Sequence, residues 1–228
     1  MKKFIVLAFI GMIGFSSCSS LKKLGLEPSN LETISAVKEV LNSSAFRAIA
    51  TLRKLDKKGV DGFLPTELQP VLASLKKLGM GAEMEKAEKK ILQVSKMMAI
   101  ESEGIIEDAI KEIKFRDAVA IVAGGNNAAT SVLKEKMYAS VKKRYSSKLD
   151  IELQKTEVTQ YWPIAANAYN LFAKNKVGDS LSDFMSERAV DALFLGMGKE
   201  ESKIRRDPKK LGKQVVTKVF DYYAKKKG

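Results

Sequence analysis

The sequence predicts an all-α protein, a single multi-helix bundle domain that follows a cleaved signal peptide. Three observations support this fold class. Apolar residues recur at intervals of three and four along nearly all of the chain after Leu31. No segment shows the period-two alternation that is typical of a half-buried strand. Capping residues and turns that contain Gly or Pro separate the apolar stripes, so we expect roughly eight to ten helices joined by short loops.

The composition favours a folded domain and removes several classes of chemistry. Of the 228 residues, 45% are hydrophobic and 29% are charged, which is enough apolar material for a buried core. The chain contains no His and one Cys. It therefore lacks the residues of a Ser-His-Asp triad, a Cys-His nucleophile and the common zinc sites. An enzyme of this composition would work with carboxylates, Lys, Ser or Tyr.

The first 28 residues have the features of an export signal followed by a tether. Residues 1–17 start with two lysines and continue as an apolar run that is too short to span a bilayer. The segment Phe15–Cys18 resembles the lipobox of bacterial lipoproteins, in which the Cys thiol is acylated, the peptide is cut before the Cys, and the new amino terminus is acylated too. We therefore expect 1–17 to be a lipoprotein signal peptide, Cys18 to be the lipidation site, and 18–28 to be a lipidated tether. The alternative is an ordinary cleaved signal with an incidental Cys nearby.

The signal also predicts the localisation of the protein. No later stretch approaches the length of a transmembrane helix. Ser19, which follows Cys18, is typical of lipoproteins that are passed on to the outer membrane. We expect a protein of the cell envelope that is lipid-anchored at the periplasmic face of the outer membrane, where an unpaired thiol would be a liability.

The remaining chain, 29–228, is expected to form one all-helical domain. Its apolar stripes predict successive helices over Leu31–Leu55, Thr66–Gly79, Met84–Met98, Ile105–Ile113, Asp117–Ala123, Asn126 to about Lys148, Tyr161–Phe172, Leu181–Ile204 and Leu211–Tyr223. The residues expected to cap or start helices are Ser29 or Asn30, Thr66, Asn126, Ser180, and Asp207 with Pro208. Pro163 should either start its helix or kink it.

Two segments carry a resemblance to a known family. Phe115–Thr130 reads FRDAVAIVAGGNNAAT, and Leu181–Pro208 reads LSDFMSERAVDALFLGMGKEESKIRRDP. Both resemble the bacterial envelope family catalogued as domain of unknown function 4197 (DUF4197). The matching features are Asp117-Ala118, Gly124-Gly125, Ala128-Ala129-Thr130, Asp191-Ala192-Leu193-Phe194, Glu200-Glu201, Ile204-Arg205 and Pro208. The resemblance implies a fold and an address but no activity or cofactor, and Lys114 stands where the family tends to have a Ser or Thr helix cap.

Acidic residues form one candidate site. Asp183, Glu187 and Asp191 repeat at intervals of four on one helix face, and Glu200 and Glu201 follow. Closely held carboxylates can bind a cation or act as an acid/base pair. The alternative is a solvated face that is balanced by Arg188 and by an i,i+4 pair between Glu201 and Arg205. No metal-ligand spacing or calcium-loop pattern accompanies the cluster, so we predict no metal site and no cofactor.

Two further segments allow a structural and a functional interpretation. Gly124–Asn127 could present backbone N–H groups to a phosphate or carboxylate, but a turn with a helix cap explains it as well. Tyr161, Trp162, Tyr169 and Phe172 could line a cleft, although their spacing also suits core packing.

The distribution of charge along the chain indicates what kind of partner the protein could bind. The chain has 40 basic and 27 acidic side chains, a net charge of +13, and removal of residues 1–17 leaves +11. Basic residues gather near the C-terminus, where anionic lipid or a cell-wall polymer would meet them. The expected contacts are Arg205, Arg206, Lys209, Lys210, Lys213, Lys225, Lys226 and Lys227. For an exported protein, this charge predicts no nucleic-acid partner.

Together these features predict a non-enzymatic binding or structural module of the envelope, with an envelope protein or an anionic envelope component as its partner. One alternative is a carboxylate-based envelope hydrolase or metal-dependent enzyme. A second alternative is a small-ligand or lipid carrier with a cavity between its helices. The sequence makes no prediction of the oligomeric state.

Overall fold

The computed structural model describes residues 27–56, 58–59, 62 and 66–226. Within these residues the chain forms helices and no strand, so the all-α, single-domain prediction is confirmed. The α-helices are α1 (Asn30–Arg53), α3 (Gln69–Leu75), α4 (Gly81–Lys111), α5 (Phe115–Ala123), α6 (Ala128–Leu153), α7 (Val158–Asn170), α8 (Leu181–Arg206) and α9 (Gln214–Lys225). Shorter helical turns are η1 (Thr66–Leu68), η2 (Lys76–Met80) and η3 (Pro208–Leu211). The expected signal peptide 1–17 and Cys18 lie outside the described residues.

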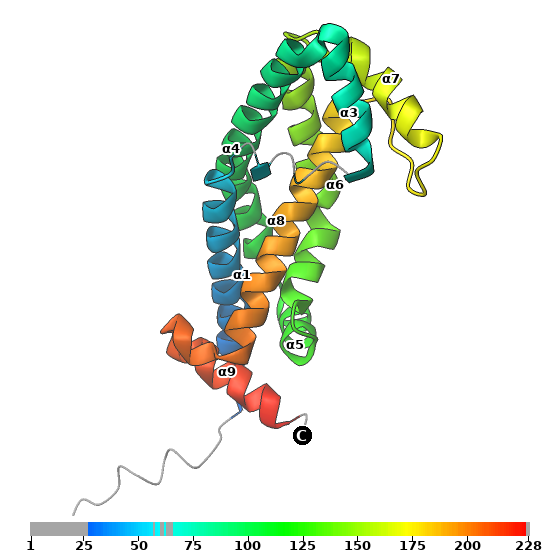
Figure 1. Ribbon diagram of the computed structural model, residues 1–228. Helices are drawn as coiled ribbons and strands as arrows, with labels where there is room; N and C mark the ends of the chain where they lie inside the picture. Colours follow the sequence, from blue (N-terminus) through cyan, green and yellow to red (C-terminus); the bar gives the residue numbers. More distant parts are fainter. Residues whose placement is uncertain (1–26, 57, 60–61, 63–65, 227–228) are drawn as a thin grey trace, which may run out of the picture.

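Four long helices, α1, α4, α6 and α8, form an up-down-up-down bundle (Figure 1). Helix α4 packs between α1 and α6, and α8 closes the bundle between α6 and α1. The antiparallel order is visible at the ends, since Lys38 near the start of α1 donates to the carbonyl of Lys111 at the end of α4, at 2.8 Å. None of the described helices has the length and apolar character needed to cross a bilayer.

The shorter helices cover the two ends of this bundle. At 1.5 Å per residue, α4 with 31 residues is about 46 Å long, whereas α1 with 24 residues is about 36 Å long. Helices α3 and α7 pack over the end that α1 does not reach, and α5 and α9 pack at the opposite end (Figure 1). The core accordingly has two clusters of buried apolar residues. One contains residues of α5 and α9 packed against the bundle, including α1, and the other contains residues of α7 packed against α4, α6 and α8.

Several predicted helix starts are confirmed. Ser29 begins α1 with a reciprocal capping box: its Oγ accepts from the N–H of Glu32 at 3.2 Å, and its own N–H donates to that carboxylate at 2.8 Å. Ser180 caps α8 by accepting from the N–H of Asp183 at 3.1 Å. Lys114 stands before α5 and makes no side-chain cap.

The predicted break between Met98 and Ile105 is wrong, because α4 runs without interruption from Gly81 to Lys111. The apolar stripe is interrupted in the sequence because Ser102 occupies the buried position between Met98 and Ile106. Ser102 is 2% exposed and satisfies its hydroxyl by donating to the carbonyl of Ala99, at 2.9 Å. A hydroxyl satisfied in this way is compatible with the core, so a polar residue at a stripe position does not end the helix.

Three other predicted boundaries differ from the structure. Helix α6 starts at Ala128 and continues to Leu153, so Asn126 does not cap it. Pro163 lies inside α7, which begins five residues earlier. Pro208 starts only the short turn η3, and the chain reverses at Gly212, whose φ of +71° favours glycine, before α9 begins.

Candidate functional site

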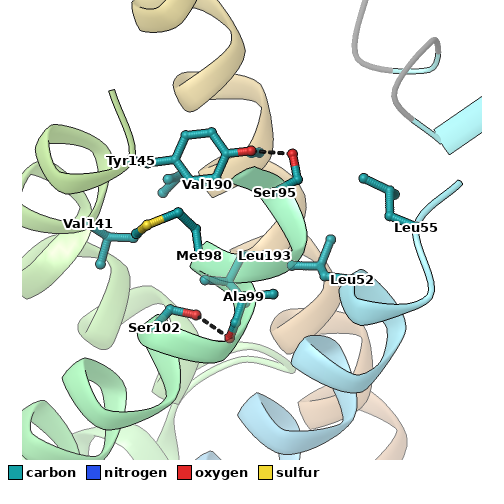
Figure 2. Close-up of a pocket in the computed structure, with 11 residues that line it drawn as sticks. Leu52, Leu55, Ser95, Met98, Ala99, Ser102, Val141, Tyr145, Val190 and Leu193 are labelled. Atoms are coloured by element: carbon teal, nitrogen blue, oxygen red, sulfur yellow. Dashed lines mark hydrogen bonds between the residues drawn. The ribbon is translucent and has the colours of Figure 1, made fainter. Parts of the chain in front are cut away.

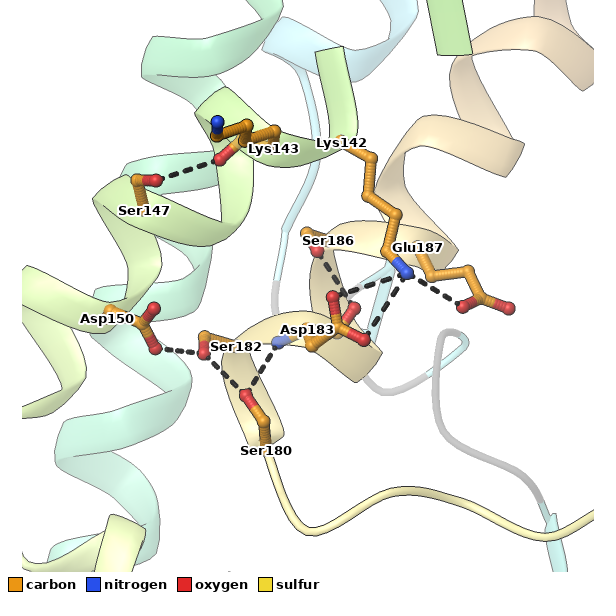
Figure 3. Close-up of polar contacts among 9 residues, drawn as sticks. All are labelled: Lys142, Lys143, Ser147, Asp150, Ser180, Ser182, Asp183, Ser186 and Glu187. Carbon is orange, nitrogen blue, oxygen red and sulfur yellow. Dashed lines mark hydrogen bonds and ion pairs between the residues drawn. The ribbon is translucent and has the colours of Figure 1, made fainter. Parts of the chain in front are cut away.

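The three carboxylates that repeat along α8 meet lysines of α6. Lys142 Nζ lies 3.3 Å from both Asp183 Oδ2 and Glu187 Oε2, as Figure 3 shows. Lys134 Nζ lies 2.9 Å from Asp191 Oδ1. Burial lowers the pKa of Lys142, but hydrogen bonds to the two carboxylates outweigh it, so the pKa is raised above its usual value. These residues form interhelical ion pairs that hold α6 against α8.

A hydroxyl-carboxylate contact extends this polar seam toward the start of α8. Ser182 donates to Asp150 of α6, and its hydroxyl also lies 2.9 Å from the hydroxyl of Ser180 (Figure 3). Arg188, which could have balanced the acidic face, instead lies over the ring of Phe184 at 5.2 Å. The acidic face of α8 is therefore neutralised by α6 and not by α8 itself.

Glu200 and Glu201 are neighbours in sequence but have different surroundings. Glu200 is partly exposed and pairs with Lys203 at 2.6 Å and with Arg47 at 3.5 Å. The hydrogen bond from Lys203 holds the pKa of Glu200 below its usual range. Glu201 is 0% exposed. The five acidic residues thus do not converge, and the described residues contain no group of three or more His, Cys, Asp or Glu that could hold a metal ion.

The carboxylate of Glu201 is bound to the start of α6. Its oxygens accept from the N–H groups of Ala129 and Thr130 at 3.0 and 2.7 Å, and from the Thr130 hydroxyl at 2.7 Å. Arg205 Nε donates a fourth hydrogen bond at 2.7 Å. The first N–H groups of a helix have no partner within it and carry partial positive charge. Glu201 therefore caps α6 from another helix.

Arg205 makes the complementary contact with the end of α5. Its Nη2 donates to the carbonyl of Ile121 at 2.9 Å, and Nη1 donates to that of Val122 at 3.4 Å. The guanidinium also lies 5.0 Å from the ring centroid of Phe220 in α9. We call Glu201, Arg205 and Thr130 the end clamp, because they tie α8 to the C-terminal end of α5 and the N-terminal end of α6.

The hydrogen bonds around the turn at Gly124–Asn127 bear on whether it binds an anion or only joins two helices. The N–H of Gly124 donates to the carbonyl of Ile121 at 3.0 Å, and the N–H groups of Ala129 and Thr130 that follow the turn are taken by Glu201. The interpretation as a turn between two helices therefore holds. A Cβ at Gly124 would lie 2.5 Å from that of Ala128, which requires glycine in this tight turn.

Sequence spacing predicted the pair between Glu201 and Arg205 but not its burial. A usable signal was present, because Glu201 continues the apolar stripe of Leu193 and Met197 at an interval of four. Since a charge on a buried stripe needs a partner, this position could have been identified as an internal ion pair.

Most of the basic residues expected to meet an anionic surface are exposed. Arg205 is the exception, since its side chain is 8% exposed and belongs to the end clamp. Lys227 lies outside the described residues. The exposed members are Arg206, Lys209, Lys210, Lys213, Lys225 and Lys226.

The η3–α9 segment, which carries most of these cations, lies at the end of the bundle where the described chain begins (Figure 1). Lys218 of α9 lies 2.6 Å from Glu32 in the first turn of α1. Hydrogen bonding to Lys218 and to the Ser29 backbone lowers the pKa of Glu32 to about 2. Lys213, just before α9, pairs with Glu39 at 3.5 Å. The start of α1 and the basic η3–α9 segment therefore share one end of the molecule (Figure 1).

A small cavity lies between α1, α4, α6 and α8 (Figure 2). Its volume is about 20 Å³, which is room for one water molecule and not for a lipid chain. The hydroxyls of Ser95 and Tyr145 hydrogen-bond to each other at its wall. Burial raises the pKa of the Tyr145 phenol. Among the described residues, this cavity gives no support to a lipid carrier.

Two of the aromatic residues near α7 are core residues. Trp162 and Tyr169 are 4% and 5% exposed, and Trp162 Nε1 donates to the carbonyl of Gly178 at 3.0 Å. The Trp162 ring packs against Phe184 of α8 at 5.4 Å between centroids. Phe172 is exposed. The core-packing interpretation therefore holds for Trp162 and Tyr169.

Comparison with known proteins gives one family match. The family model described as "Protein of unknown function (DUF4197)" matches residues 27–221. No curated protein and no solved structure matches the chain. The matched span contains the whole bundle and the end clamp.

Proposed function

The chain belongs to the family described as Protein of unknown function (DUF4197), and on this premise we propose that it is a lipid-anchored, non-enzymatic binding module of the cell envelope. In this proposal Cys18 is acylated, and the helical domain rests with its basic end on an anionic membrane surface. The described helices supply the docking surface, and the lipid supplies the attachment.

One observation carries the proposal: the start of α1 and the basic η3–α9 segment lie at the same end, joined by the ion pair between Glu32 and Lys218. Cys18 precedes Glu27 by nine residues. A link of that length spans at most about 30 to 32 Å when fully extended. An acylated Cys18 would therefore keep this basic end close to the bilayer. Each exposed cation held near an anionic surface adds about 1 kcal/mol of attraction.

The use of the carboxylates supports a binding role over a hydrolytic one. Each acidic residue of the candidate cluster has a cationic partner from its own chain. An acid/base pair needs carboxylates that reach a substrate. Glu201, the most buried of them, is engaged in four hydrogen bonds.

The anchor is tested with Cys18→Ala and Ser19→Ala in cells fed a labelled fatty acid. We expect Cys18→Ala to abolish labelling and release the protein from the membrane fraction, whereas Ser19→Ala keeps the label. Continued labelling of the Cys18→Ala chain would contradict the assignment of the lipidation site.

The docking surface is tested by flotation with vesicles of neutral lipid, with and without phosphatidylglycerol, using the Cys18→Ala chain. We expect Lys209→Glu with Lys210→Glu to reduce binding to the anionic vesicles. The control carries the same charge change on the side of α6, as Lys143→Glu with Arg144→Glu. Equal losses in the two variants, or binding that high salt leaves unchanged, would contradict docking through the basic end.

A further inference from the structure

An open groove lies on the outer face of α8, beside the turn that joins α5 to α6. Its volume is about 410 Å³, within the range of small-molecule sites. Its polar lining comes from α8 and from the turn: Lys199, Ser202, Lys203 and Arg206, with Asn126 and Asn127. No Asp or Glu is among the described residues that line it. The groove thus concentrates positive charge and neutral hydrogen-bond donors.

Two of its three cations have no carboxylate partner within the part of the chain that the structure describes. Among the described residues, neither Lys199 nor Arg206 makes an ion pair, and Arg206 Nε has only a 3.4 Å hydrogen bond to the carbonyl of Ser202. Lys203 differs, since it pairs with Glu200. Lys199 and Arg206 are seven residues apart, so they lie on the same face of the helix, two turns apart.

The amide of Asn127 is available because of the end clamp. Asn127 occupies the N-cap position of α6, where an Asn side chain usually accepts from the helix N–H groups. Here it makes no such bond, and Glu201 accepts from those N–H groups instead. The Asn127 side chain lies against α8 at Gly198, where an added Cβ would come within 3.4 Å of the Asn127 Cβ and 3.8 Å of its Nδ2. The amide therefore lines the groove without a role in capping.

The two walls of the groove are held in place by the same clamp. Glu201 binds α8 to the start of α6, and Arg205 binds it to the end of α5. The helix positions that carry the cations of α8 and the turn that carries the amides therefore keep a fixed spacing before any ligand arrives. Only the side chains have to be ordered on binding, which costs less entropy than ordering a flexible backbone as well.

We propose that this groove binds a phosphate group that carries more than one negative charge, as in a phosphomonoester or a pyrophosphate. Lys199, Lys203 and Arg206 supply charge-assisted hydrogen bonds, and Arg206 can form two parallel bonds to phosphate oxygens. Asn127 and Ser202 add neutral donors. The site would bind this group whether or not Cys18 carries a lipid, since no part of the groove includes the tether.

The test is titration calorimetry of the purified full chain in neutral detergent, with inorganic pyrophosphate and with a water-soluble short-chain phosphatidic acid as probes. We expect binding, and we expect Lys199→Ala with Arg206→Ala to weaken it by at least about tenfold, because two charge-assisted bonds are lost. Tighter binding of phosphatidic acid would assign the site to a lipid headgroup, and tighter binding of pyrophosphate would assign it to a soluble phosphate.

The chain offers a matched control in a second basic groove on α6. That groove has a volume of about 510 Å³ and includes Lys143 and Arg144, but its Lys148 is paired with Glu101. Lys143→Ala with Arg144→Ala removes the same charge, and we expect it to leave pyrophosphate binding unchanged. Absence of binding by both probes at millimolar concentration would overturn the proposal, as would equal weakening in the two double variants. Matching melting temperatures would show that each variant is folded.

Discussion

Replacing Glu201 by Gln should destabilise the protein far more than the same replacement at Glu200. Glu201 is 0% exposed and accepts four hydrogen bonds, whereas a Gln amide has one oxygen and an NH₂ group that would face donors. The replacement also leaves Arg205 inside the protein without its counter-charge. Breaking one partner of a buried ion pair costs about 3 to 5 kcal/mol.

The neighbouring position provides the control. Glu200 is 19% exposed and makes pairs with Lys203 and Arg47 near the surface. Each pair of this kind contributes about 0 to 1 kcal/mol, so the loss of both in Glu200→Gln should change the free energy of unfolding by at most about 2 kcal/mol. Both variants remove one negative charge and keep the length of the side chain, and they differ only in burial and partners.

The measurement is urea unfolding followed by circular dichroism. With a slope of about 2 to 3 kcal/mol/M, a cost of about 3 to 5 kcal/mol should lower the unfolding midpoint of Glu201→Gln by about 1 to 2.5 M. Thr130→Val provides a milder variant, since it removes one of the four bonds and should cost about 1.5 to 3 kcal/mol. Midpoints that coincide for Glu201→Gln and Glu200→Gln would refute the end clamp.

Three further predictions concern single contacts. Tyr145→Phe removes the hydroxyl partner of the buried Ser95 and should cost about 1 to 3 kcal/mol in urea unfolding, less in combination with Ser95→Ala. The pKa of Glu32 is lowered from 4.5 to about 2, so the stability it contributes is present above pH 4.5 and is lost as the pH falls toward 2. Lys218→Met should therefore raise the pKa of Glu32 in an NMR titration, and an unchanged value would contradict the pair. Gly212→Ala should lower the melting temperature, because the left-handed backbone at Gly212, with φ of +71°, costs an Ala residue about 1 to 2 kcal/mol. Nothing lies within 4 Å of the added Cβ, so no steric clash adds to this cost.

Local features of the fold were predictable because they depend on residues close together in sequence. The capping box of α1 needs only Ser29 and Glu32, three positions apart, and both bonds form. The break predicted before Ile105 failed for an equally local reason. Ser102 takes a core position in α4, and hydropathy alone cannot show that its hydroxyl is satisfied by the carbonyl of Ala99.

The candidate site was predictable only in part, because its partners are remote in sequence. Spacing placed Asp183 and Glu187 on one helix face, and both do meet a single side chain, Lys142. Lys142 is 41 and 45 residues away from them, and it belongs to α6. No periodicity within α8 encodes which helix will pack beside it. The same pattern therefore fits a cation site, a solvated face and a set of interhelical ion pairs.

The end clamp explains why, within the segments that carry the family resemblance, the buried residues need not be the residues that bind a ligand. Glu201 and Arg205 come from one of these segments, and Thr130 comes from the other, and they meet inside the protein. A buried charge tolerates few replacements, because its partners would be left unpaired. Residues of this kind are therefore determined by the packing of the fold and not by contact with a ligand. The outward residues of the same helix, such as Lys199 and Arg206, have no such constraint from the core, and they are the ones that can meet a ligand.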